Sequence, residues 1–210
     1  MRNVFKGVKG KLFMVLLLVL IAACSLVVLS GCTAKERQKF FEAYGMDNAY
    51  NHTTSGVVRH APKSISYYID PSVTGNYRTA VEDAIKKANA LTGKVTMTYN
   101  TNNAKSSYVI KVENVGSTGW SGLNSSYANP TTGEITQSTI TLNSYYLKSY
   151  SANMLKEVIL HEIGHTFGLR DLNETSDLVK YSVMYYQADY TYVYTQYQDF
   201  DKANIEWYYD

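Results

Sequence analysis

The stretch "HEIGHTFGLRD" at residues 161–171 decides how this chain is read. At about 100° per residue, His161 and His165 lie roughly 40° apart around a helix axis and one turn apart along it, so both imidazoles can reach one ion. Glu162 falls beside that ion, where its carboxylate can take a proton from water. The pattern predicts a helix that carries a catalytic metal site with zinc as its occupant.

The residues after the second histidine offer a third ligand. Gly168 can adopt the left-handed conformation that ends a helix and turns the chain back, so that Asp171 approaches the same ion. A carboxylate is a competent zinc ligand, and three protein ligands leave a fourth position open. Glu174 is a rival, but it follows His165 too closely to lie on the separate helix that such a ligand needs. We therefore expect Asp171.

Before the motif, the expected order of elements is strand, helix, strand, strand, edge strand and strand. An apolar 3.6-residue period predicts a helix that Asn76 caps and Gly93 ends, and Ser151 is expected to cap the motif helix. Short runs rich in β-branched and aromatic residues predict strands. These runs occupy residues 64–70, 94–100, 107–113 and 138–143, with an edge strand inside 116–133.

The motif resembles the HExxHxxGxxH/D signature of the metzincin zinc endopeptidases, in the aspartate variant of snapalysin-like members. "SVMYY" at 182–186 resembles their Met-turn, which implies that Met184 lies beneath the zinc and that Tyr186 approaches it as a catalytic residue. "DFDKANIEWYY" at 199–209 resembles the closing helix of matrixin-like members. The resemblance implies an α+β fold: a twisted, mostly parallel sheet with an antiparallel edge strand, two helices including the active-site helix, and a small C-terminal subdomain.

A basic N-terminus and an unbroken apolar run at 12–30 predict an export signal. "LSGC" at 29–32 resembles the bacterial lipoprotein signal, which implies that Cys32 is lipidated and becomes the mature N-terminus. A chance cysteine after an uncleaved anchor is the alternative, since the run is long enough to span a bilayer. We expect a protein tethered to the outer face of the bacterial cell membrane, or shed from it.

Three segments follow from these signals: a signal peptide at 1–31, a tether or short pro-region at 32–55, and a catalytic domain at 56–210. The exported part has no disulfide, because the only other cysteine, Cys24, lies in the apolar run. Residues 1–31 hold four basic side chains and no acid, which leaves 16 basic against 18 acidic side chains beyond them. That balance argues against a nucleic-acid partner, and we expect a monomer.

The chain is thus expected to be a zinc-dependent endopeptidase that cleaves proteins or peptides at or near the cell surface, with water activated by Glu162. The alternative is a membrane-tethered adhesin or cell-wall binder with a structural or inactive zinc site. Latency also stays open, with Asp47 or His52 covering the zinc. The sequence offers no support for calcium, and we expect His52 and His60 to be ordinary surface residues without a metal.

Overall fold

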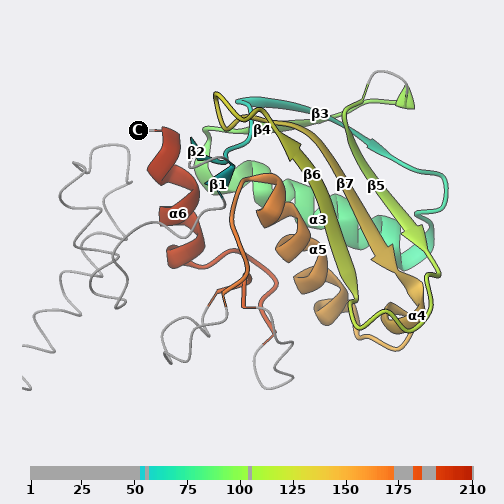
Figure 1. Cartoon of the computed structure of the whole chain (residues 1–210). Coiled ribbons are helices and arrows are strands. Elements are labelled where there is room, and N and C mark those ends of the chain that lie inside the picture. The colour runs from blue at the N-terminus through green and yellow to red at the C-terminus, as the bar shows by residue number, and fades with distance from the viewer. Residues whose placement is uncertain (1–52, 55–56, 104–105, 173–181, 186–192, 210) are drawn as a thin grey trace, which may run out of the picture. The chain divides into compact units, whose positions relative to one another are not determined.

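The computed structural model describes residues 53–54, 57–103, 106–172, 182–185 and 193–209, and a five-stranded sheet is its centre. The strand order is β4-β3-β5-β7-β6 (Figure 1). All neighbours are parallel except β6, which pairs antiparallel with β7. This arrangement confirms the predicted α+β class with an antiparallel edge strand. The bounds are β3 (Ser64–Ile69), β4 (Thr96–Tyr99), β5 (Tyr108–Glu113), β6 (Gly122–Ala128) and β7 (Ile135–Asn143).

The strands form because alternate positions can be buried on one face of the sheet. In β3, Ile65, Tyr67 and Ile69 are buried, whereas Ser64 and Ser66 are exposed. This two-residue period fits a sheet that has one face against the core. The same alternation recurs in β7, where buried side chains are Ser138, Ile140 and Leu142.

Two helices cover the buried face and pack against each other: α3 (Gly75–Thr92) and α5 (Ala152–Thr166) (Figure 1). α5 lies next to the edge strand β6, and it also contacts β7. The C-terminal helix α6 (Asp199–Tyr209) has the bounds of the predicted closing helix, and it packs against α3. The edge strand and the motif helix are therefore neighbours, which places the motif beside an open sheet edge.

Several predicted boundaries differ from the structure. α3 is preceded by an extended Thr74 at its N-cap, so Asn76 lies inside the first turn and does not cap the helix. Gly75 explains the shift, because its φ of +53° lets the chain turn directly into the helix. At the other end, Gly93 ends α3 in the left-handed conformation, as expected.

Three short elements were not predicted: β1 (Thr53–Thr54), β2 (Val57–Val58) and α4 (Ser144–Leu147). β1 and β2 pair antiparallel, and β1 lies at the end of the segment 32–55 that was expected to be a tether. β7 also begins three residues before the expected strand at 138. Two-residue strands and one-turn helices carry too few residues for a periodic pattern.

Among the described residues, no helix is long and apolar enough to cross a membrane. The apolar run at 12–30 and the proposed lipidation site Cys32 lie outside the described residues, as do Asp47 and His52.

Candidate metal centre

The helix α5 holds both histidines of the motif. Its N-terminus is capped by Ser151, whose Oγ accepts a hydrogen bond from the Met154 amide at 3.3 Å. The side chains of His161 and His165 remain 16% and 14% exposed, and their ring centroids lie 4.8 Å apart. The helix therefore presents the two imidazoles side by side, while its other face is buried through Leu155, Ile159 and Ile163.

The chain reverses at Gly168, directly after α5. Gly168 has a φ of +95°, and the Leu169 amide donates to the Gly164 carbonyl at 3.1 Å to close the helix end. A Cβ at position 168 would also clash with the carbonyl oxygen of Arg59. Backbone conformation and space both require glycine here, and the turn returns Asp171 toward the helix.

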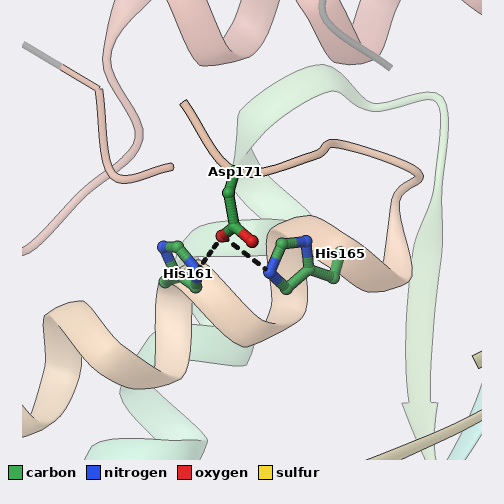
Figure 2. Close-up of side chains that lie close together, drawn as sticks. All are labelled: His161, His165 and Asp171. Carbon is green, nitrogen blue, oxygen red and sulfur yellow. Dashed lines mark ion pairs between the residues drawn. The ribbon is translucent and has the colours of Figure 1, made fainter. Parts of the chain in front are cut away.

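His161, His165 and Asp171 converge on one point (Figure 2). Asp171 Oδ1 lies 2.9 Å from His161 Nε2 and 3.3 Å from His165 Nε2. The three atoms that could bind a metal lie within 4.8 Å of one another. Asp171 is 55% exposed, so the centre is open to solvent on its side.

The chemistry of this donor set fits a metal ion. His161 Nδ1 lies 2.8 Å from the Val183 carbonyl oxygen, and His165 Nδ1 lies 2.8 Å from that of Leu169. Because a carbonyl can only accept, each Nδ1 carries a proton, and each Nε2 faces Asp171 as the nitrogen that a metal could bind after losing its own proton. Ligand histidines usually have their second nitrogen held in this way.

The charge of the centre also favours a cation. Burial by itself would lower the pKa of His161, but the hydrogen bond to Asp171 and the negative charges of Glu162 and Asp171 raise that pKa to about 9. The hydrogen bonds from His161 and His165 hold the pKa of Asp171 far below its usual range. The proton on His161 therefore balances the negative charge of Asp171. A metal cation that bound the two histidines and Asp171 would replace this proton.

The carboxyl group of Glu162 reaches the edge strand β6. The residue is only 5% exposed, and burial raises the pKa of its carboxyl. A Cβ at Gly122 in β6 would lie 2.6 Å from Glu162 Oε1 and 2.8 Å from its Cγ. Glycine at this position of the edge strand therefore makes room for the Glu162 side chain.

Met184 lies under the motif helix. It is 2% exposed, and its sulfur fills the space where Gly164 would otherwise carry a side chain. The Leu172 amide donates to the Met184 carbonyl at 2.7 Å, which joins the segment after Asp171 to this turn. Gly164, between the two histidines, therefore leaves room for the Met184 side chain. The Met-turn resemblance likewise implies that Met184 lies beneath the metal ligands.

Asp201 of α6 is a residue that the sequence did not single out. It is 1% exposed and accepts hydrogen bonds from the Ser182 hydroxyl, from the Val183 amide at 3.2 Å and from the Gln198 amide at 2.8 Å. Burial raises its pKa to about 6. Because the Val183 carbonyl holds His161 and the Val183 amide donates to Asp201, Asp201 supports the backbone that positions this imidazole. The residues around Asp201 gave no sequence signal for this contact.

A second missed feature is a polar cluster between the sheet and the helix. Asn124 of β6 donates to the Glu162 carbonyl at 2.7 Å and to Thr166 Oγ1 at 2.8 Å. The buried Ser138 of β7 donates to Asn124 Oδ1 at 3.1 Å and lies 3.0 Å from Thr166 Oγ1. These bonds fix the edge strand against α5 next to the metal centre. Single polar residues in strands gave no sequence signal for this contact.

His60 corrects one expectation. It is 7% exposed, not a surface residue, because its ring packs under the β6–β7 turn with Nε2 3.2 Å from the Thr132 carbonyl oxygen. Its Nδ1 lies 3.0 Å from the Ala61 carbonyl oxygen. Two further candidates, Tyr186 and the rival ligand Glu174, lie outside the described residues.

The solved structures that match this chain include two that each cover 77% of it. Myroilysin is 12% identical, with a TM-score of 0.46, and the match covers 77% of this chain and 96% of that one. High choriolytic enzyme 1, a hatching enzyme zinc-protease from Oryzias latipes, the medaka fish, is 16% identical, with a TM-score of 0.44 and coverage of 77% and 94%. No curated protein sequence matches the chain.

The model of one protein family matches residues 31–180, most of the chain. Its description is "Dual-action HEIGH metallo-peptidase", and the match contains the five letters of that name at 161–165 together with Asp171. The predicted zinc-metalloprotease resemblance is confirmed at the level of a metallopeptidase. The chain belongs to the dual-action HEIGH metallo-peptidase family.

Proposed function

We propose that this metallopeptidase is a zinc-dependent endopeptidase. The observation that carries the proposal is the convergence of His161 Nε2, His165 Nε2 and one oxygen of Asp171. The buried carboxylate of Glu162 lies beside them on the side of the open sheet edge. Two imidazoles and a carboxylate suit zinc, and three protein ligands are typical of catalytic rather than structural zinc sites.

His161, His165 and Asp171 would hold the ion. When bound, zinc supplies Lewis acidity toward a peptide carbonyl and lowers the pKa of water. The anionic Asp171 partly neutralises that charge, so proton transfer by the protein becomes more important. Met184 packs against Gly164 between the two histidines, and the Val183 carbonyl keeps His161 in the required tautomer.

Glu162 is the general base of the proposed reaction. Its burial raises the pKa of the carboxyl toward the range in which a group both accepts and returns a proton. Glu162 would take a proton from the attacking water and deliver it to the leaving amine. Tyr186 is proposed to stabilise the oxyanion, by its position two residues after Met184.

The substrate chain is proposed to lie extended along β6. This strand is the edge of the sheet next to α5, and its first residue, Gly122, contacts Glu162. Backbone pairing of an added strand would bring a peptide bond to the metal centre without requiring a particular side chain. Backbone pairing does not require a free amino or carboxyl terminus, so a segment in the middle of a substrate chain could bind to β6. This favours cleavage of internal bonds, as in an endopeptidase.

Zinc stoichiometry and peptide-library cleavage of the purified full chain test the proposal. We expect one zinc per chain, cleavage at internal bonds, loss of cleavage on chelation and its return with added zinc. Zinc binding without cleavage of any peptide would contradict the proposal and favour a surface-binding protein with a structural zinc. Cleavage restricted to terminal residues would contradict the endopeptidase assignment alone.

We also propose that the enzyme is a lipoprotein on the outer face of the bacterial cell membrane, acting on proteins or peptides near that surface. The proposal is supported by the apolar run at 12–30 and the "LSGC" stretch that ends at Cys32. Mass analysis of the N-terminal peptide, with and without globomycin, tests it. An unmodified Cys32 in the mature protein would contradict it.

A further inference from the structure

The outer edge of β6, which pairs with no further strand among the described residues, offers hydrogen-bonding groups at every second residue. The Ser138 amide of β7 donates to Ser107 on the far side, at 3.0 Å, so the paired residues Ser126 and Ser138 do not bond to each other. The amide and carbonyl of Ser126 therefore face outward. By the two-residue period, those of Gly122 and Asn124 also face outward.

The two ends of this edge differ in what lies beside them. Gly122 contacts Glu162, so the reacting peptide bond of a substrate would lie near this end. Ser126 lies four residues farther along the strand, at a rise of about 3.4 Å per residue. A peptide strand that followed the edge from Gly122 toward Ser126 would thus lead away from the metal centre.

Arg59 occupies the outward carbonyl at the far end. Its Nη2 donates to the Ser126 carbonyl oxygen at 3.3 Å. A peptide strand added to the edge needs that oxygen as the acceptor for one of its own amides. The guanidinium and a substrate amide therefore compete for the same atom.

The backbone that carries Arg59 is fixed on two sides. The His60 amide donates to the Gly133 carbonyl at 3.1 Å, and the Ile135 amide donates to the His60 carbonyl at 2.8 Å. On the other side, the Arg59 carbonyl packs against Gly168, in the turn that leads to Asp171. The backbone contacts of Arg59 and His60 therefore hold the guanidinium at the edge of β6 whether or not a substrate is bound.

We propose that Arg59 limits substrate pairing on β6 to the residues that face Gly122 and Asn124. The inference rests on the proposed endopeptidase function and names a specificity determinant of that same site. Antiparallel pairs outnumber parallel ones two- to three-fold, so the substrate is taken as antiparallel to β6. The substrate residues that run from Gly122 toward Ser126 are then those on the N-terminal side of the scissile bond. On that side, backbone pairing with β6 would end before the residue that faces Ser126.

The test is a nested peptide series with the full chain. All peptides share one cleavable bond and the same C-terminal part, and they are extended one residue at a time on the N-terminal side. In the wild type we expect kcat/KM to reach a plateau, with less than a twofold gain from the two residues that would face Ser125 and Ser126. In Arg59→Ala the same two residues should give a gain of about fivefold, the value of one added ladder hydrogen bond.

Two variants control the interpretation. Arg78→Ala removes an exposed arginine of α3 that pairs with Glu82, and it should keep the wild-type plateau. Arg59→Lys keeps a hydrogen-bond donor and the positive charge. Its gain in kcat/KM from the longer peptides should therefore be close to that of the wild type and well below that of Arg59→Ala. The gain is calculated as the ratio of long to short peptides within each variant, so a general change in activity cancels.

The outcomes separate the two proposals. If the wild type cleaves peptides but Arg59→Ala shows the same plateau, the role of Arg59 is wrong and the endopeptidase proposal stands. If Arg59→Ala instead loses cleavage only of peptides with an acidic residue opposite Ser126, Arg59 binds that side chain and does not limit pairing. If the wild type cleaves no peptide of any length, both proposals fail.

Discussion

The motif segment and the supporting segment build the same centre in different ways. The motif segment, α5 with the turn to Asp171, sets its ligands by local geometry: helix spacing and one glycine turn. The supporting segment, residues 182–185 with α6, acts across the sequence, since the Val183 carbonyl lies 22 residues after His161 and Asp201 binds the Val183 amide 18 residues later. The ligands of a metal site can therefore follow from a short pattern, whereas their orientation depends on distant residues.

The largest effect is expected in the motif segment, for Glu162→Gln. The substitution keeps the shape of the side chain but removes the group that accepts a proton, so kcat should fall about 10³-fold. Zinc content should stay at the wild-type value, as measured on the same samples. Glu113→Gln, which changes an exposed carboxylate of β5, is the matched control and should keep full activity.

Asp171→Ala tests whether local geometry also supplies the third ligand. Loss of one of three ligands should weaken zinc binding more than about a hundredfold, measured by competition with a chelator. The matched variant is Glu174→Ala, which should bind zinc like the wild type. The reverse result, with zinc lost only in Glu174→Ala, would replace Asp171 by Glu174 in the site.

Asp201→Asn tests the supporting segment through the pH dependence of stability. Burial raises the pKa of Asp201 to about 6 from an ordinary 3.8, so the folded chain binds this proton more tightly than the unfolded chain. The stability that the proton provides is fully present below the unfolded pKa and is lost as the pH rises through the folded pKa.

Between pH 4 and pH 7 the free energy of unfolding of the metal-free wild type should fall by about 2 kcal/mol relative to Asp201→Asn. Urea unfolding at each pH measures this difference. Asp199→Asn, on an exposed acid of the same helix, should follow the wild type. Parallel curves for wild type and Asp201→Asn would mean that this carboxyl does not titrate in that range.

The smallest effect is expected for Gly122→Ala at the contact between edge strand and motif helix. Its Cβ would lie 2.6 Å from Glu162 Oε1 and 2.9 Å from Val158 Cγ1, so the carboxylate must move. A displacement of the base by a few tenths of an ångström should lower kcat about tenfold and leave zinc content unchanged. Ser125→Ala, which shortens an exposed side chain of the same strand, should have no such effect. Equal kcat values for the two variants would show that Gly122 does not position Glu162.

The sequence predicted those parts that depend on local pattern. The β-rich run at 64–70 became β3, the cap at Ser151 and the turn at Gly168 were found as expected, and α6 spans the 199–209 that the family resemblance implied. Each of these signals lies within one short segment: residue types typical of strands, of helix caps and of left-handed turns, or a stretch that resembles a known helix.

The sequence could not predict contacts between distant segments. Nothing in the residues around Asp201 indicates that it will meet Val183, and nothing in "SGLNS" at 121–125 indicates that Gly122 will face Glu162. Such contacts are fixed only when the sheet, α5 and α6 pack together. The burial of His60 was missed for the same reason, because a single histidine outside a periodic segment gives no sign of the turn that covers it.

Anomalous diffraction from crystals of the zinc-loaded full chain, recorded on both sides of the zinc absorption edge, would show whether His161, His165 and Asp171 hold one catalytic zinc. We expect one zinc peak about 2.0–2.2 Å from His161 Nε2, His165 Nε2 and an Asp171 carboxylate oxygen, with Glu162 beside the ion but not bound to it. A peak that Asp171 does not ligate, or a fourth protein ligand that closes the site, would contradict a catalytic zinc centre built by the motif segment.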